Sequence, residues 1–169
     1  GFIFRNGLVA NFLEEYYATG NPSPTTAAVL LARAIMELPV GGELPHRIVR
    51  PFTAQIEMDE GTWEERDYTA VLASTVEQIG LGFRPFIRSQ ERDHAFHLLA
   101  VTAGPLGIAL ELPRIRLGLA TSQKNFPSAV TGRAVFRSSE PIGYTIDGDM
   151  HVAKDGEVIL ETGPQVELI

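Results

Sequence analysis

The chain has 169 residues, of which 44% are hydrophobic and 21% are charged, as expected for one globular domain with a core of its own. It has no cysteine, which excludes disulfides, thiolate metal sites and a cysteine nucleophile, and is compatible with a cytoplasmic location. Its formal net charge of −7 argues against nucleic acid binding over a broad face, because such binding needs clustered Lys and Arg.

The first residues, Gly1-Phe2-Ile3-Phe4, have the apolar character of a β-strand. No initiating Met, basic leader or signal-peptide cleavage site accompanies them. A terminal strand of this kind exposes an unpaired edge unless it pairs with another segment. We therefore expect the protein to continue upstream, with residues 1–169 forming a single domain of it.

Two helices are predicted next. Residues 8–18 repeat apolar side chains every four positions, and Gly20 follows as a typical C-terminal cap. Ser23-Pro24 matches a helix N-cap followed by proline at the first helical position. The spacing of apolar residues after it predicts a second helix that ends before Pro39.

The apolar period then changes to two, which is typical of half-buried strands. Alternation over residues 47–59 predicts a strand that ends at a turn at Glu60-Gly61. After a short connection around Trp63, residues 67–75 are rich in β-forming side chains. We predict a β-hairpin from these two segments.

The middle of the chain combines loops, a buried strand and short helices. Glycines and a proline predict a loop over 80–85, and the apolar run 95–102 predicts a buried strand. The uncharged stretch 95–110 is broken by Gly and Pro and is shorter than the roughly 20 residues that cross a bilayer. Residues 106–112 and 114–120 are predicted as two short helices separated by a proline, which has no backbone donor.

The C-terminal part returns to short strands separated by Asp-Gly and Gly-Pro breaks. The predicted strands are 131–137, 142–147, 150–154, 157–162 and 165–169. Helices followed by many short strands predict an α+β fold: a mostly antiparallel β-sandwich or open barrel with two N-terminal helices and short helices near 105–120.

A pair of carboxylates stands out in the segment Tyr144 to Asp149, where an apolar run stops at Asp147-Gly148-Asp149. Asp-Gly favours a hairpin turn because it adopts positive φ at low cost. Two acids flanking a glycine also suit a phosphate and metal site. Both interpretations stay open, whereas Asp155-Gly156 is interpreted as a turn alone.

Two further features allow more than one interpretation. Arg84, Arg88 and Arg92 either steer the domain to an acidic lipid surface or form a solvated face. The apolar stretch 98–110 either lines an acyl-chain pocket or packs into an ordinary core.

Several short segments, taken in order, resemble the C-terminal domain of the diacylglycerol kinase-like lipid kinases, the superfamily that includes the sphingosine and ceramide kinases. Together they extend over nearly the whole chain. They are the entry Gly1-Phe2-Ile3 with the helix Asn11 to Tyr17, the loop 80–85, Asp93 with the strand 96–99, and 144–149, which is similar to an Asp-Gly-Glu segment.

The resemblance implies a lipid-binding β-sandwich that acts together with a first, nucleotide-binding domain. The Gly-Gly-Asp-Gly-Thr loop of that first domain does not occur in this sequence. The implied cofactors, ATP and Mg²⁺, would therefore need an N-terminal domain of the same protein, and this chain alone is expected to be inactive. The implied substrate is a diacylglycerol-like lipid, reached from the cytoplasm by peripheral membrane contact.

The resemblance also implies roles for individual residues. Asp147 matches the acid that deprotonates the lipid hydroxyl, and Gly148 would let the backbone pass close to the nucleotide. Asp149 replaces a Glu that acts near the phosphates or their metal, with an arm one methylene shorter. Asp93 matches an acid that helps Mg²⁺ to order a loop, although His94 follows it in place of Gly, and an exposed loop acid is the alternative.

A zinc site at His94 and His97 is disfavoured, because these positions point to opposite faces of a strand. Sphingosine kinases carry an acidic residue after Gly-Phe-Ile-Ala, where this chain has Arg5, so a diacylglycerol-type lipid is favoured over a sphingoid base. The alternative function is a non-catalytic lipid-binding or membrane-docking module. An acyl hydrolase is disfavoured because no Gly-x-Ser-x-Gly occurs.

Overall fold

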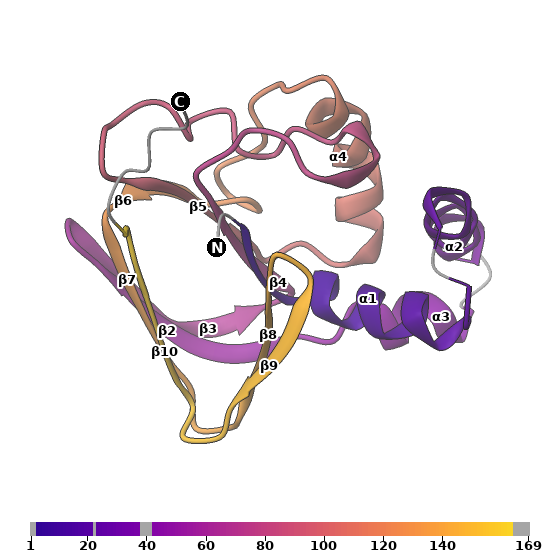
Figure 1. The fold of residues 1–169 in the computed structure, drawn as a ribbon, viewed down its shortest axis with the longest axis horizontal. Helices are drawn as coiled ribbons and strands as arrows, with labels where there is room; N and C mark the ends of the chain where they lie inside the picture. Colours follow the sequence, from indigo (N-terminus) through magenta and orange to yellow (C-terminus); the bar gives the residue numbers. More distant parts are fainter. Residues whose placement is uncertain (1–2, 22, 38–41, 164–169) are drawn as a thin grey trace.

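Two antiparallel sheets and four α-helices make up the described part of the computed structural model, which covers residues 3–21, 23–37 and 42–163. The sheets face one another as a sandwich that does not close into a barrel (Figure 1). The predicted α+β fold is confirmed.

The larger sheet has six strands. They are β1 (Ile3–Gly7), β4 (Ala70–Ser74), β5 (Phe96–Val101), β6 (Ser128–Thr131), β8 (Ile142–Ile146) and β9 (Asp149–Ala153). Their order across the sheet is β6-β5-β4-β1-β8-β9. The N-terminal strand β1 therefore pairs on both sides, with β4 and β8, so its edge is covered inside this domain.

The smaller sheet faces the larger one across a core of interdigitating side chains. Its strands are β2 (Phe52–Met58), β3 (Gly61–Tyr68), β7 (Arg133–Arg137) and β10 (Glu157–Glu161), in the order β10-β7-β2-β3. Phe4 from one sheet and Phe136 from the other are both buried, with ring centroids 5.3 Å apart. Alternating side chains of the two inner faces thus form one shared core.

The outer face of the larger sheet is covered by α4 (Pro105–Arg116), as Figure 1 shows. Ile108 and Ile115 of this helix pack against a buried cluster that includes Leu72 and Leu99. Leu98, in contrast, lies in the core between the sheets. Both faces of β5 are therefore occupied by packed side chains, which favours core packing over an acyl-chain pocket at this strand.

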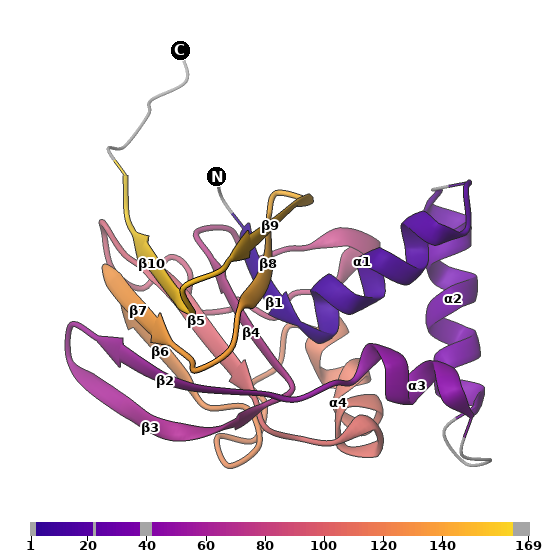
Figure 2. The same cartoon turned by 90° about the horizontal axis from the view of Figure 1, so that it is seen from below.

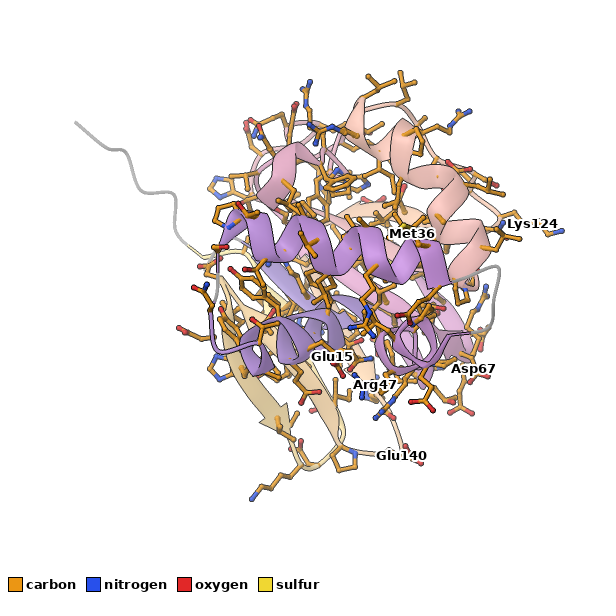
Figure 3. The ribbon with its side chains drawn as sticks, turned by 90° about the vertical axis from the view of Figure 1, so that its right-hand side faces the viewer. Glu15, Met36, Arg47, Asp67, Lys124 and Glu140 are labelled. Carbon is orange, nitrogen blue, oxygen red and sulfur yellow. The ribbon has the colours of Figure 1, made fainter. Side chains whose placement is uncertain are left out.

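Three helices extend from one side of the sandwich (Figure 2). They are α1 (Leu8–Ala18), α2 (Pro24–Glu37) and α3 (Glu43–Ile48). The two predicted N-terminal helices are confirmed, and the Ser23 hydroxyl accepts a hydrogen bond from the Thr26 N–H at 3.0 Å, as an N-cap does. Figure 3 shows Glu15 and Arg47, which join α1 to α3 through a 2.6 Å ion pair.

The α3 helix corrects the prediction that a strand begins near residue 47. Pro45 lies in the first turn of α3, where a backbone N–H would have no intrahelical partner, so proline is tolerated there. Ile48 is buried at 4% exposure from the end of this helix and not from a strand.

The prediction of two helices separated by Pro113 is also wrong. A single helix α4 contains Pro113 in its last turns, because the proline removes only one hydrogen bond and the helix continues for one more turn. Its Pro113 carbonyl still accepts from the Leu117 N–H at 3.1 Å. Gly118 then adopts a φ of 66°, which is typical of a residue that ends a helix.

Two predicted strands are each divided between the sheets. The predicted strand 67–75 contains the end of β3 and all of β4, with Thr69 between them. The predicted strand 131–137 is divided at Gly132 into β6 and β7. Trp63 lies inside β3 and not in a connection. The remaining tail strands agree with the prediction, apart from 165–169, which lie outside the described residues, as do Gly1 and Phe2.

Among the described helices, none has the length and apolarity needed to cross a membrane.

Candidate functional site

The candidate site is centred on the turn between β8 and β9. Ile146 pairs with Asp149, which leaves Asp147 and Gly148 as the two turn residues, with φ values of 52° and 107°. Positive φ at both positions is the geometry that Asp-Gly favours in two-residue hairpins. The turn interpretation is confirmed, and it places the Asp147 side chain at one end of the larger sheet.

Asp147 is fixed to the first described residue of β1. Its backbone N–H donates to the Ile3 carbonyl at 2.9 Å, and its Oδ1 accepts from the Ile3 N–H at 2.9 Å. Figure 2 shows the turn beside the start of β1. The carboxylate is therefore held in place by the backbone of a strand about 140 residues away in sequence, and it is not on a mobile arm.

A cation lies beside this carboxylate. Burial lowers the pKa of Arg5, while the charge of Asp147 and the phenol of Tyr17 act in the opposite direction. Arg5 pairs across the sheet with Thr145, and the Arg5 Nε is buried with no hydrogen-bond acceptor among the described residues. A guanidinium held close to Asp147 favours the ionised carboxylate, which is the form a general base needs.

Tyr17 of α1 closes one side of the turn. A β carbon built on Gly148 would lie 3.9 Å from the Tyr17 hydroxyl oxygen, so the phenol and the turn are neighbours. Asp149 begins the edge strand β9 and is exposed. Its cross-strand partner Ile146 packs against the core between the sheets, so Asp149 and Arg5 belong to opposite faces of the larger sheet.

Asp93 lies at the same end of the larger sheet but not beside Asp147. It is exposed in the loop before β5, and β4 and β1 separate β5 from β8. Strands β5 and β8 are three spacings of about 4.8 Å apart, or roughly 14 Å, so the Asp93 loop and the Asp147 turn are treated as two separate sites. No group of three or more His, Asp or Glu side chains suited to a metal occurs in the part of the chain that the structure describes.

The two histidines of the disfavoured zinc site have different environments. His94 is exposed at a φ of 52°, whereas His97 is 2% exposed. The His97 Nδ1 accepts from the Arg88 N–H at 3.4 Å, and its ring meets Phe86 edge to face with centroids 5.8 Å apart. Burial, with a smaller effect of the Arg88 charge, lowers the pKa of His97 to about 4.

His97 makes folding stability depend on pH. Because its pKa is about 4 in the folded protein and about 6.5 in the unfolded chain, the unfolded state binds more protons between these values. Stability is then lost as pH falls from 6.5 towards 4. We expect the wild type to lose about 3 kcal/mol more than His97→Gln between pH 7 and pH 4, measured by urea unfolding. Equal losses in the two proteins would exclude this role for His97.

The arginines considered for membrane steering are paired with carboxylates. The pairs are Arg84–Glu77 at 2.5 Å, Arg88–Glu91 at 2.6 Å and Arg92–Glu60 at 2.8 Å. Partners of opposite charge at these distances cancel most of the field of each cation. The solvated-face interpretation is therefore favoured.

Two neighbours of Asp147 were not predicted from the sequence as part of the site. Arg5 was interpreted only as a departure from sphingosine kinases, and Tyr17 as part of an apolar helix face. The position of Arg5 directly after the apolar segment Gly1 to Phe4 is a local signal for it. Tyr17 carries no comparable signal.

No family model and no curated protein sequence matches the chain. Three solved structures from Bacillus anthracis strain Sterne, assigned as diacylglycerol kinases, align with 95% of it at 10%, 13% and 16% identity, with TM-scores of 0.51, 0.60 and 0.56. The alignments cover 46%, 49% and 50% of those proteins, so this chain spans about half of their length. The resemblance is thereby confirmed at the level of the fold, which this chain shares with about half of each of those diacylglycerol kinases.

Proposed function

We propose that this chain is the C-terminal domain of an ATP-dependent lipid kinase that phosphorylates the hydroxyl of a diacylglycerol-type lipid. The observation that carries the proposal is the placement of Asp147, whose Oδ1 is held by the Ile3 N–H at 2.9 Å beside the Arg5 guanidinium. A fixed, ionised carboxylate is what deprotonation of an alcohol requires.

Phosphoryl transfer needs an oriented nucleophile and neutralised phosphate charge. Asp147 orients the lipid hydroxyl through a hydrogen bond and accepts its proton as the oxygen attacks. Gly148 has no side chain to keep a nucleotide away from the backbone. The exposed Asp149 carboxylate is an oxygen donor of the kind that Mg²⁺ prefers, and Mg²⁺–ATP, when bound, supplies the phosphoryl group. We assign its binding to an N-terminal nucleotide-binding domain of the same protein together with Gly148 and Asp149.

Arg5 supports the choice of a neutral lipid. A sphingoid base carries an ammonium group close to its reacting hydroxyl, and a second cation beside the Arg5 guanidinium would be repelled. A diacylglycerol-type lipid has no such charge. Asp93 is proposed as a Mg²⁺ ligand that orders its own loop, separately from the ion carried by the nucleotide, because the Asp93 loop and the Asp147 turn are separate sites.

A non-catalytic lipid-binding or membrane-docking module remains the second candidate, and one observation favours it. In and just after α4, Leu106, Leu110 and Leu117 are 66%, 70% and 69% exposed, and exposed apolar side chains of this size are suited to a lipid surface. This function would not need Asp147.

Lipid-dependent ADP release by the intact protein separates the two candidates. We expect ADP release that requires Mg²⁺, ATP and diacylglycerol micelles together. Sedimentation of the same protein with diacylglycerol-containing vesicles, in the absence of ATP, measures lipid binding alone. Vesicle binding without lipid-dependent ADP release would favour the non-catalytic module and contradict the kinase.

A further inference from the structure

One edge of the larger sheet is formed by β9, which pairs with β8 alone among the described strands (Figure 2). Its residues from Asp149 to Val152 are all exposed. The strand contains no proline, and its pairing with β8 runs without a register shift. A regular edge strand of this kind offers its free backbone N–H and C=O groups to another strand.

The free backbone groups on this edge belong to Met150 and Val152. The Asp147 N–H donates to a carbonyl of β1 at 2.9 Å, and successive residues of a strand direct their backbone groups to opposite sides. The backbone groups of Ile146 therefore face β9, where its partner is Asp149. Every second residue of β9 from Asp149 on bonds to β8 in the same way, so Met150 and Val152 direct their N–H and C=O groups away from the sheet.

Two copies of β9 are self-complementary in one antiparallel register. Pairing about His151 places Met150 opposite the partner's Val152, and a twofold axis repeats this pair. All the outward N–H and C=O groups of the two strands then bond to one another. The side chains of Met150 and Val152, which are 45% and 62% exposed, lie opposite each other on one face and cover each other.

The charges at the ends of β9 also match in this register. Asp149, exposed at the start of the strand, lies opposite the partner's Ala153. The next residue of the partner is Lys154, which is exposed just after its strand. Because a lysine side chain has a flexible four-carbon stem, its ammonium group can reach the Asp149 carboxylate. Each copy thereby brings a cation to a residue of the other copy's candidate site.

The other described edge strands are less suited to pairing with themselves. β3 carries four consecutive charged residues, Glu64 to Asp67. β10 begins with Glu157 and ends with Glu161, and symmetric pairing would bring these like charges opposite each other. β6 has only four residues and directly follows Pro127. Charges, proline and short length are the features by which natural sheets prevent edge pairing.

We propose that two copies of this chain form a twofold-symmetric dimer by antiparallel pairing of their β9 strands about His151, with Lys154 of each copy beside Asp149 of the other. Such a contact uses the same surface on both copies and is closed at two. Five residues on each side make a small interface, so we expect a dimer Kd on the order of 10 µM. The inference goes beyond the proposed function and does not depend on catalysis.

Sedimentation equilibrium of the intact protein from about 1 to 200 µM measures this Kd directly. Val152→Pro removes an outward N–H and leaves the bonds between β8 and β9 in place. It should raise Kd about 100-fold or more, because the dimer loses two hydrogen bonds and keeps two unpaired carbonyls. Val152→Thr, which retains the N–H, should stay within about fivefold of the wild type.

Charge reversal tests the pair between the copies. Asp149→Lys and Lys154→Asp should each weaken the dimer by roughly two- to thirtyfold, since each dimer contains two such pairs. The double variant should recover most of the loss. If Val152→Pro does not fold, this cycle decides the proposal. A wild type that is monomeric at about 200 µM, a dimer unchanged in a folded Val152→Pro protein, or charge reversals without recovery in the double variant would overturn it.

Discussion

Replacing Asp147 with Asn in the intact protein is expected to lower kcat for lipid phosphorylation by about 10² to 10⁴-fold, the usual contribution of a general base. The amide cannot accept the proton of the lipid hydroxyl. It keeps an Oδ1 that can accept from the Ile3 N–H, as the carboxylate does at 2.9 Å. Asn also tolerates the positive φ of 52° at this position, so the turn should be preserved. Steady-state kinetics with dioctanoylglycerol and saturating ATP measure the loss.

Asp155→Asn is the matched control for this substitution. Asp155 also precedes a glycine in a turn, and Gly156 has a φ of 73°. Asp155 itself is not part of the candidate site. Its variant should retain kcat within about twofold, as surface substitutions usually do. If the Asp147→Asn protein is folded and as active as the Asp155→Asn control, Asp147 is not the general base of the reaction.

The second large effect concerns the core between the sheets. Phe136→Ala should lower the free energy of unfolding by about 3 to 5 kcal/mol, from lost burial and the cavity left behind. Phe136 is 0% exposed, and its ring lies 5.3 Å from that of Phe4 in the facing sheet. Urea unfolding of the purified protein, followed by circular dichroism, measures the change.

Ile159→Ala serves as the comparison, because Ile159 lies on the neighbouring strand β10 and is 50% exposed. We expect it to cost about 1 kcal/mol or less, since most of its surface is already in water. Similar losses in the two variants would mean that the facing sheets do not share a packed core at Phe136.

Local patterns were enough to predict the N-terminal helices and the turns. The four-residue apolar repeat and the Ser23-Pro24 cap specify α1 and α2, because these signals lie within one or two helical turns. Asp147-Gly148 likewise predicts its own two-residue turn, since both residues adopt positive φ at low cost.

Errors arose where the structure depends on contacts between distant segments. The predicted strands 67–75 and 131–137 run through Thr69 and Gly132, yet the chain passes from one sheet to the other there. A run of β-forming residues does not identify the sheet to which a strand belongs. The candidate site also depends on contacts between segments that are distant in sequence. The hydrogen bond from Ile3 to Asp147 spans 144 residues, so nothing local to either residue predicts that Arg5 lies beside this carboxylate.

Transfer of the γ-phosphate of ATP to a lipid hydroxyl tests the central proposal most directly. The intact protein is incubated with γ-labelled ATP, Mg²⁺ and dioctanoylglycerol, and the lipid fraction is separated and identified by mass spectrometry. We predict that the label appears in the lipid as a phosphate monoester at the free hydroxyl. Folded, intact protein that binds ATP and dioctanoylglycerol but leaves the lipid unlabelled would contradict the account.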